Sequence, residues 1–516
     1  MVFEVATGGI PVRRTPTYGT RSALIAVLVV GVATFAVTLI GSWIPSLWGD
    51  EAASVLSATR PWPSLFAMLG RIDAVHGVSY VMMHLWVDLF GSSPFSVRFP
   101  SAVAIGLCAA ALAWIGYRLR SIGFGVLAGV FAAVNPRLGY AGIEARAYAF
   151  DALFATLIIL VLLELLRRPD DGRGRHGTMP WWVGYGALVA LTTATFLYAG
   201  AMVAVVGILL VVARRFRAQC RRWLVSSLIG LAVASPVALL GVTQTAQIAF
   251  LGQEDRANLK ALFIDMWFVD IPSAIIGWTL VLVALIGWWI ARKRQPRLGA
   301  EVIGVVWAAV PLAAVLALNI VHPDYTPRYL TFGAPAIALI QAAGIVRLWS
   351  LPWARWGRVR LLPIAALLAL AVIAVPAWAD LRTPYAKRGS DWNEVAAVIE
   401  QGKRPGDAIV FQENTSPSWR PRLALDTNPK PFAGLKDVGL VTPYQEAPLW
   451  FAETRSVGQA EAAGAFDGVT RVWVVQTITG RPRTVGTDGV ADLERAGFTP
   501  TQHERLNVSD ITLYTR

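Results

Sequence analysis

Charged residues are scarce in this chain. Asp, Glu, Lys and Arg make up 15% of its 516 residues, whereas hydrophobic residues make up 55%, and the mean hydropathy is +0.53. Because soluble domains carry about 25% charged residues, this composition excludes an ordinary soluble protein. The sequence predicts a polytopic α-helical membrane protein.

Cysteine and histidine are also rare, with two Cys and five His in the whole chain. Cys108 lies in an apolar run and Cys220 in an Arg-rich segment, and neither has His or Cys neighbours at metal-ligand spacing. We therefore expect both thiols to be inert. A cleavage pattern is lacking after the apolar run 23–40, so we interpret this run as a retained first span rather than a signal peptide.

Long apolar runs are the main feature of the sequence up to residue 379. Read as spans of about 20 residues, they predict eleven transmembrane helices at 22–43, 99–117, 121–136, 147–166, 181–197, 199–213, 223–250, 272–291, 300–320, 329–346 and 361–379. From residue 380 onward the hydropathy falls. The sequence thus predicts a membrane domain at 1–379, with a long first outer loop at 44–98, and a soluble domain at 380–516.

The net charge of +13 is a signal of topology rather than of nucleic-acid binding. Connections on one side of the predicted bundle carry 22 basic residues, including those of RRFRAQCRR (214–222) and RKRQPR (292–297), against 8 on the other. By the positive-inside rule the N-terminus is cytoplasmic and residues 380–516 are extracytoplasmic. We therefore expect a multi-pass protein of the plasma (inner) membrane, in contact with membrane lipid and with no nucleic-acid partner.

The C-terminal domain reads as mixed α/β. Asp391 and Glu394 stand at the spacing of a capping box ahead of the helical run EVAAVIEQG. Strand-like runs follow at DAIVF, RVWVVQT and ITLYT. Its charge is nearly balanced, so an anionic lipid surface is not an obvious partner of this domain.

The predicted outer face holds the acidic residues that could do chemistry. Asp50 and Glu51 directly follow the first span in SLWGDEAAS. In NPRLGYAGIEARAYAFDALF (135–154), the residues Glu144, Tyr148 and Asp151 fall at i, i+4 and i+7 and would share one helical face. The helix dipole would account for Glu144 alone, but a carboxylate one turn deeper usually faces a polar cavity.

A further polar segment is HPDYTPRYLTFGAP (322–335), between the ninth and tenth predicted spans. Arg328 and Tyr329 at a span entrance fit two interpretations. They are suited to anchor the helix at the headgroup region. Arg328 is equally suited to bind a phosphate, because guanidinium presents a fork of donors that matches phosphate oxygens.

Taken together, four segments resemble the polyprenol-phosphate-dependent glycosyltransferases of the GT-C superfamily, in particular the family 39 protein O-mannosyltransferase-like group. The segments are WGDE (48–51), HGVSYVMMHLWVDLFG with RFPSA (76–91, 98–102), NPRLGYAGIEARAYAFDA (135–152) and PRYLTFGAPAIAL (327–339). The resemblance implies an inverting transferase that takes a sugar, with mannose preferred, from a polyprenyl-phosphate donor. The acceptor would be a cell-envelope glycan, lipoglycan or protein outside the membrane.

Carried onto this chain, the resemblance implies that Asp50 is the base and Glu51 its neighbour, and that Arg146 and Arg328 match donor-phosphate positions. Relatives often have His-Pro-Pro where this chain has His76-Gly77-Val78. The remaining candidates are assigned to two ligands. Tyr329 and Arg98 are expected to bind the donor phosphate. The sugar or acceptor is expected to contact Glu144, Tyr148, Asp151 and His76.

The chemistry is consistent with these residue types. A sugar hydroxyl is a poor nucleophile and needs a carboxylate to accept its proton, whereas a phosphate leaving group needs cations rather than an acid. The sequence identifies no certain cofactor, and a divalent metal ion held by Asp50 and Glu144 could supply part of the positive charge. A transporter or lipid flippase is the alternative, because intramembrane charges also mark translocation paths. A receptor or scaffold is a third interpretation.

Overall fold

The computed structural model describes residues 17–168, 175–244, 257–321, 325–350, 361–478 and 490–516. Some of the predicted basic loop residues, such as Arg13 and Arg355, lie outside these ranges. The chain forms two compact units: unit 1 comprises 1–40, 75–78 and 99–379, and unit 2 comprises 41–74, 79–98 and 380–516. Unit 2 thus combines most of the predicted first outer loop with the segment from residue 380 onward, and the predicted division into a membrane domain and a soluble domain stays a prediction.

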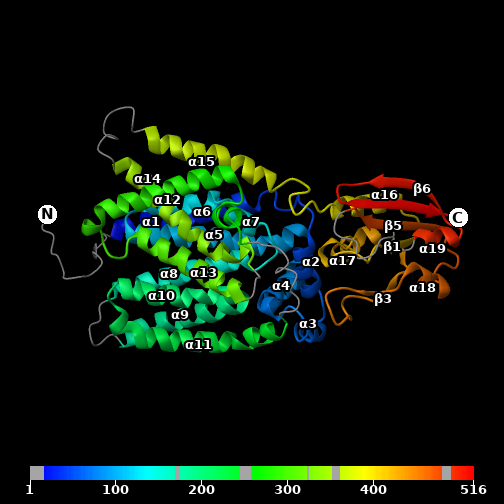
Figure 1. Cartoon of the computed structure of the whole chain (residues 1–516), viewed down its shortest axis with the longest axis horizontal. Coiled ribbons are helices and arrows are strands. Elements are labelled where there is room, and N and C mark those ends of the chain that lie inside the picture. The colour runs from blue at the N-terminus through cyan, green and yellow to red at the C-terminus, as the bar shows by residue number, and fades with distance from the viewer. Residues whose placement is uncertain (1–16, 169–174, 245–256, 322–324, 351–360, 479–489) are drawn as a thin grey trace. The chain divides into compact units, whose positions relative to one another are not determined.

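Unit 1 is a bundle of helices that lie side by side (Figure 1). The predicted spans lie mostly on helical segments, but residues 245–250 of the predicted span 223–250 lie outside the described residues, and the predicted spans at 199–213 and 329–346 begin in 3-10 turns. The helices are α1 (Thr17–Leu39), α5 (Pro94–Leu119, shared with unit 2), α6 (Ile122–Val134), α7 (Pro136–Gly142), α8 (Tyr148–Arg167), α9 (Arg175–Thr195), α10 (Met202–Val212), α11 (Phe216–Thr243), α12 (Ile271–Ala291), α13 (Ala300–Val321), α14 (Ala334–Ser350) and α15 (Leu361–Asp380).

Seven of these helical segments are long and apolar enough to cross a membrane, and an eighth span results if the bent pair α6 and α7 counts as one. Short 3-10 or π turns connect others: η2 (Leu197–Ala201), η4 (Ala261–Asp265), η5 (Arg292–Arg294) and η6 (Pro327–Gly333). Exposed apolar side chains such as Leu28, Val233 and Ile290 cover the outside of the bundle, as a lipid-facing surface requires. The chain is therefore a multi-pass membrane protein.

The break between α6 and α7 has a local cause. Pro136 occupies the first position of α7, where its missing N–H costs nothing, and the Asn135 side chain accepts from the Leu138 N–H at 3.1 Å. The same side chain donates to the Trp267 carbonyl oxygen at 3.2 Å. These bonds fix a 64° bend between the two helices.

Unit 2 contains the first loop and the C-terminal segment. The loop forms α2 (Gly49–Ala58), α3 (Trp62–Leu69), η1 (Ala74–His76) and α4 (Gly77–Phe90), of which residues 75–78 belong to unit 1. The C-terminal segment adds the helices α16 (Trp392–Gly402), η9 (Pro417–Trp419), α17 (Leu423–Thr427), η10 (Lys430–Phe432), α18 (Val457–Ala462) and α19 (Val490–Arg495).

The strands of unit 2 are β1 (Ala408–Phe411), β2 (Lys436–Asp437), β3 (Leu440–Thr442), β4 (Glu453–Thr454), β5 (Arg471–Thr477), β6 (Thr499–Arg505) and β7 (Ser509–Thr515). Five form one sheet in the order β2-β1-β5-β7-β6. Its β2-β1-β5 part is parallel, and β7 and β6 are antiparallel. The predicted α/β character and the three predicted strands are confirmed.

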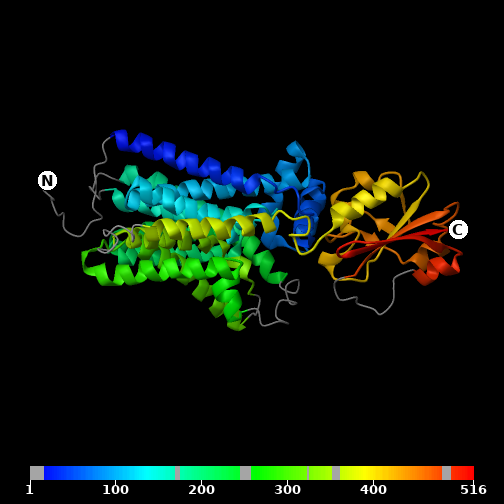
Figure 2. The ribbon, with the colours of Figure 1, turned by 90° about the horizontal axis from the view of Figure 1, so that it is seen from above.

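Helices cover both faces of this sheet (Figure 2). Val457 and Ala460 of α18 and Leu493 of α19 pack with Ala408, Val410, Val472 and Val474, whereas Gly402 at the end of α16 lies against Trp473 on the opposite face. Trp473 is a buried core residue, 1% exposed. The parallel strands β1 and β5 are therefore apolar on both faces, as parallel strands covered by helices usually are.

The predicted capping box at α16 is wrong. Asp391 is the N-cap residue but makes no side-chain cap. Its carboxylate instead accepts from the Val508 N–H at 2.7 Å, the Ser509 N–H at 2.8 Å and the Ser509 hydroxyl at 2.7 Å. Three hydrogen bonds from residues at the start of β7 stabilise the carboxylate more than one bond from an N–H in the first turn of α16 would. Tertiary contacts therefore override the local capping pattern.

The loop and the C-terminal segment are joined inside unit 2 by buried polar contacts. Arg60, 1% exposed, donates to the carbonyl oxygens of Ala447 (2.8 Å) and Leu449, and Thr59 bonds the Tyr444 hydroxyl at 2.8 Å. Burial lowers the pKa of Arg60 to about 10. The C-terminal domain is therefore not separate from the first loop.

We predict that Asp426→Asn stabilises unit 2 at pH 8 but not at pH 4. The Oδ2 atom of Asp426 is buried without a hydrogen-bond partner among the described residues, and burial raises the pKa of this carboxyl from 3.8 to about 7. The folded state therefore holds a proton that the unfolded state has lost, and stability falls as the pH rises between these two values.

The measurement is thermal unfolding of the full chain from pH 4 to pH 8. The variant stays neutral, so its advantage over the wild type should grow through this window. Asp467→Asn, at an exposed position of the same domain, is the control. An advantage that is equal at pH 4 and pH 8 would contradict the assignment.

Candidate functional site

Unit 1 gathers arginine side chains around a buried imidazole. Arg146 Nη2 lies 2.8 Å from His76 Nε2, and Arg146 and Arg328 both act electrostatically on His76. Burial, followed by these two cations, lowers the pKa of His76 well below 6.5. The imidazole is therefore neutral, and its Nε2 accepts a hydrogen bond from the guanidinium of Arg146.

A third arginine belongs to this group. Arg137 of α7 is 7% exposed, and its electrostatic neighbours include Glu144, Asp265 and Arg328. Its Nη2 donates to the Asp265 carbonyl oxygen. The sequence alone did not identify Arg137 as a candidate site residue. Its place after Asn135-Pro136, a helix start inside a span, was the signal that could have identified it.

Glu144 lies beside these cations but not on the expected helical face. Residues 144–146 form a bend between α7 and α8, so only Tyr148 and Asp151 of the predicted trio are in one helix. Ser101 donates to the Glu144 carbonyl oxygen at 2.7 Å, which satisfies the backbone without a helical turn. The predicted shared face is wrong for Glu144, although its side chain is fully buried near Arg137.

Asp151 is held between helices. Its Oδ1 accepts from the Thr195 hydroxyl of α9 at 2.7 Å, and the residue is 1% exposed. This geometry favours an interhelical contact over the sugar or acceptor contact that was predicted.

An aromatic cluster adjoins the cations. Tyr329 stacks on Tyr198 with ring centroids 5.5 Å apart, and Phe196 meets Tyr148 and Tyr329 edge-on at 5.8 and 5.2 Å. Arg328 lies over the Tyr148 ring at 5.8 Å. The sequence alone did not identify Phe196 and Tyr198 as site residues. The chain contains many aromatic residues, and nothing in the segment between α9 and α10 distinguishes these two. Together the arginines and rings form a cationic, apolar-walled site suited to an anion with a hydrocarbon tail.

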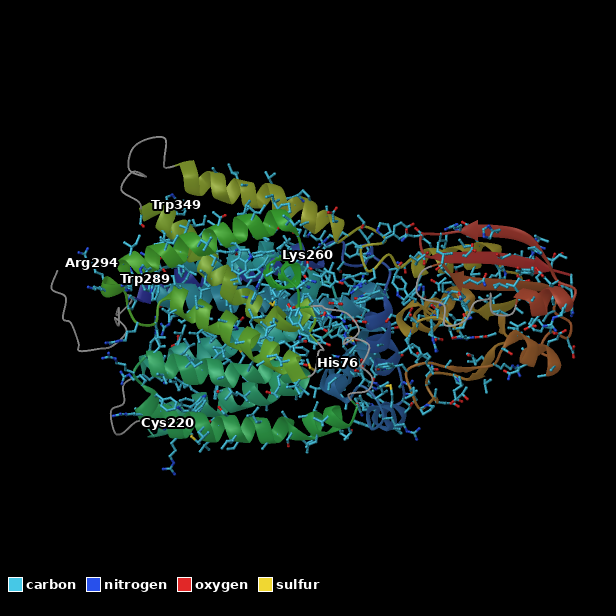
Figure 3. All side chains as sticks on the ribbon, in the orientation of Figure 1. His76, Cys220, Lys260, Trp289, Arg294 and Trp349 are labelled. Atoms are coloured by element: carbon cyan, nitrogen blue, oxygen red, sulfur yellow. The ribbon has the colours of Figure 1, made fainter. Side chains whose placement is uncertain are left out.

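The site lies at one end of unit 1. Figure 3 shows His76 and Lys260 at the end of the bundle opposite Cys220, Trp289 and Arg294. Lys260 at the site end forms an ion pair with Asp265 at 2.7 Å. The Arg-rich segments around Cys220 and Arg294 thus lie at the other end, in agreement with the two-sided charge distribution in the sequence.

Unit 2 holds the predicted acid pair, and the structure separates its members. Glu51 is fully buried and forms a double ion pair with Arg98, Nε to Oε1 at 2.8 Å and Nη2 to Oε2 at 2.6 Å. Arg98 also donates to the carbonyl oxygens of Ser42 and Pro45 at 2.6 and 2.8 Å, and of Ser46 at 3.1 Å. This set of acceptors favours a structural role for Arg98 and Glu51 over phosphate binding and catalysis.

Asp50 differs from its neighbour. It lies in the first turn of α2 and is only partly buried, where the helix dipole favours a negative charge. Gly49 packs so closely under Ser418 that a Cβ would lie 2.3 Å from the Ser418 Cβ. The C-terminal segment therefore fixes the turn that presents Asp50.

No group of three or more His, Cys, Asp or Glu side chains within the described ranges could hold a metal ion. Asp50 and Glu144 belong to different units. A divalent ion shared by these two carboxylates therefore stays a prediction.

Comparison with known proteins agrees with this architecture. Residues 78–239, just under a third of the chain, match the family model described as dolichyl-phosphate-mannose-protein mannosyltransferase. ArnT from Cupriavidus metallidurans bound to undecaprenyl phosphate superposes with a TM-score of 0.56 at 14% identity, over 96% of this chain and 98% of that one. Its apo form gives 0.59 at 13% identity, with the same coverage. The chain has the GT-C fold.

A more distant GT-C structure agrees as well. The archaeal oligosaccharyltransferase AglB from Archaeoglobus fulgidus, in complex with an inhibitory peptide and a dolichol-phosphate, has a TM-score of 0.51 at 11% identity, over 90% of this chain and 70% of that one. No curated protein matches the sequence. The GT-C resemblance predicted from the four sequence segments is confirmed.

We predict that Glu51→Gln destabilises the protein, whereas Asp50→Asn does not. Removing one partner of a buried ion pair leaves the other charge uncompensated, at a cost of about 3–5 kcal/mol. Thermal unfolding of the full chain in detergent is the measurement, with the partly buried Asp50 next to Glu51 as the matched control position. Equal melting temperatures for wild type and Glu51→Gln would refute the structural role.

Proposed function

We propose that this protein is a membrane glycosyltransferase that moves a sugar from a polyprenyl-phosphate donor to a cell-envelope acceptor. The observation that carries the proposal is that Arg146 and Arg328 lie at the neutral His76, with Arg137 as an electrostatic neighbour of Arg328. The GT-C fold supports it, as does the family-model match, and ArnT with undecaprenyl phosphate is a neighbour of the same fold.

The arginine group fits the donor phosphate. As the anomeric carbon–oxygen bond breaks, its electron pair stays on the phosphate, which leaves as a lipid monophosphate with increased negative charge. Guanidinium groups already in place stabilise that charge without reorganisation, so no general acid is needed. His76, neutral and bonded to Arg146, acts as a positioning residue on the donor side rather than as the predicted sugar or acceptor contact.

Asp50 is the proposed base. The acceptor hydroxyl forms the new bond to the anomeric carbon and gives its proton to the Asp50 carboxylate, with inversion of configuration. Because Glu51 is committed to Arg98, Asp50 is the member of the pair left for this role. Glu144, near Arg137, is the remaining candidate for contact with the sugar.

The proposal includes placement in the plasma (inner) membrane, with the N-terminus cytoplasmic and residues 380–516 outside. It is supported by the basic segments at the end of unit 1 opposite His76 (Figure 3). Mannose is the preferred sugar, on the family-model description. The acceptor is a glycan, lipoglycan or protein of the cell envelope.

We predict that Asp50→Asn lowers transfer by about 10²- to 10⁴-fold, the usual contribution of a general base, while donor binding persists. The assay follows the release of polyprenyl phosphate from a polyprenyl-phosphate mannose by purified protein in nanodiscs. Asp73→Asn, at another acid of the first loop, is the control and should retain activity if the protein folds. Turnover of Asp50→Asn within about threefold of wild type would reassign the base, and no turnover by wild type with any lipid-linked sugar would favour the transporter alternative.

We also predict that Arg146→Ala and Arg328→Ala weaken donor binding by about tenfold or more, because each loses a charge-assisted contact. Arg328→Lys should recover only part of the affinity, since an ammonium cannot reproduce the fork of donors. Equilibrium binding of polyprenyl phosphate measures this, with Arg71→Ala as a control arginine in the first loop. Unchanged affinity in both alanine variants would leave Arg328 as an interfacial anchor.

A further inference from the structure

The C-terminal part of unit 2 contains a cavity that the proposed transfer reaction does not use. Its volume is about 300 Å³, at the lower end of the range of ligand pockets. Polar groups of Glu413, Asn414, Arg422 and Arg455 line it, together with the apolar side chains of Phe411 and Val438. It lies beyond the carboxyl end of β1, the edge of a parallel sheet where ligands usually bind.

Arginines pair with the carboxylates beside the cavity, and Arg420 Nη1 lies 3.7 Å from Glu413 Oε2. Arg422 donates from Nε to Glu413 Oε1, and from Nη1 and Nη2 to the two carboxylate oxygens of Asp437. Its guanidinium also lies over the Phe411 ring at 4.9 Å. Every nitrogen of Arg422 is therefore engaged, and the residue shapes the cavity instead of offering a free positive charge.

Arg455 supplies donors to the same space. Its Nε donates to the Val438 carbonyl oxygen at 3.0 Å, which fixes the guanidinium plane, while Nη1 and Nη2 bond to no residue within the described ranges. The cavity thus offers directed N–H donors from Arg455 and carboxylate acceptors from Glu413. Apolar walls lie beside both.

This cavity lies close along the chain to the turn that presents Asp50. Three residues after Asn414 the chain enters η9, whose Ser418 packs directly on Gly49. The helix α17, which begins just after Arg422, also contacts α2. The cavity and the candidate base Asp50 are therefore linked by two short segments of unit 2, η9 and α17, which both contact the α2 region.

We propose that the cavity binds an uncharged hexose unit of the acceptor glycan and thereby positions the acceptor for transfer. This inference rests on the proposed function, and it names the class of acceptor for the proposed transfer as a glycan of neutral hexoses. A sugar hydroxyl both donates and accepts hydrogen bonds, and the cavity lining contains a carboxylate, from Glu413, and a guanidinium, from Arg455. The C–H face of the ring suits Phe411 and Val438.

The proposed ligand is neutral because an anionic group would lie beside the Glu413 carboxylate in the lining. Arg420 and Arg422 both pair with this carboxylate, and Asp437, outside the lining, pairs with Arg422. Acidic sugars are therefore the comparison that the test includes.

The test is direct binding of mannotriose to the full chain in nanodiscs, without donor, by saturation-transfer NMR titration. Arg455→Ala should weaken binding at least tenfold, the usual effect of a lost hydrogen bond to a charged group. Thr454→Trp, which fills the cavity from a different lining position, should do the same. Arg505→Ala, at an exposed position on β6, is the matched control and should bind as wild type does.

Melting temperatures close to that of wild type show that the variants are folded. Glucuronic acid oligomers serve as the anionic comparison, and tighter binding of these than of mannotriose would overturn the assignment to neutral sugars. Equal mannotriose affinity in wild type and both cavity variants, or no binding by wild type, would overturn the site itself.

A transfer assay separates this inference from the proposed function. Arg455→Ala should retain turnover with octyl mannoside, a short acceptor, while losing at least tenfold with a long mannan. If wild type binds mannotriose through Arg455 but transfers to neither acceptor, the proposed function fails and the binding site stands. If transfer to both acceptors is equally efficient in wild type and Arg455→Ala, the positioning role fails and the transferase stands.

Discussion

The buried pair between Glu51 and Arg98 is the interaction on which the geometry of unit 2 depends. A guanidinium removed from water needs all its N–H groups satisfied, and here the acceptors are one carboxylate and the backbone carbonyls of Ser42, Pro45 and Ser46. The pair thereby ties the end of the first span, the start of α2 and the start of α5 into one arrangement. The first turn of α2, and with it the partly buried Asp50, is positioned as a consequence.

The two adjacent acids therefore have different environments despite their identical chemistry. Glu51 is 0% exposed and pairs with Arg98, whereas Asp50 is only partly buried and follows Gly49, which packs closely against Ser418. An adjacent pair on a helix must point to different sides, so one carboxylate can act as a structural anchor only if the other is turned away. The glycine is required because any side chain there would displace the C-terminal segment.

Much of the fold follows from the sequence because hydropathy and charge act locally. Apolar runs of span length and Arg-rich loops identify the helices and the two ends of unit 1, and the short apolar runs identify β1, β5 and β7. The side-chain partners do not follow in this way. Asp391 accepts a hydrogen bond from Ser509, more than a hundred residues away, instead of capping its own helix. Arg98 forms an ion pair with Glu51, at the other end of the first loop. Local sequence patterns do not predict such contacts.

The candidate site shows the same division. Arg146 and Arg328 could be named from motif resemblance. Arg137, Phe196 and Tyr198 join them only because α6 and α7 meet at a 64° bend and η2 separates α9 from α10. The i, i+4, i+7 spacing of Glu144, Tyr148 and Asp151 predicts one helix. In the structure the Ser101 hydroxyl donates to the Glu144 carbonyl oxygen, so the chain can bend at Glu144 without leaving this oxygen unpaired.

A neutral imidazole among arginines has a physical consequence for donor binding. If His76 were charged, it would add to the repulsion between Arg146 and Arg328; because burial keeps it neutral, it accepts a hydrogen bond and holds Arg146 in one orientation. The positive charge of the site is then carried by guanidinium groups alone, which stay charged at any physiological pH. Anion binding at this site is therefore set by geometry rather than by titration, and a pH dependence of transfer would have to arise from the carboxylates that meet the acceptor.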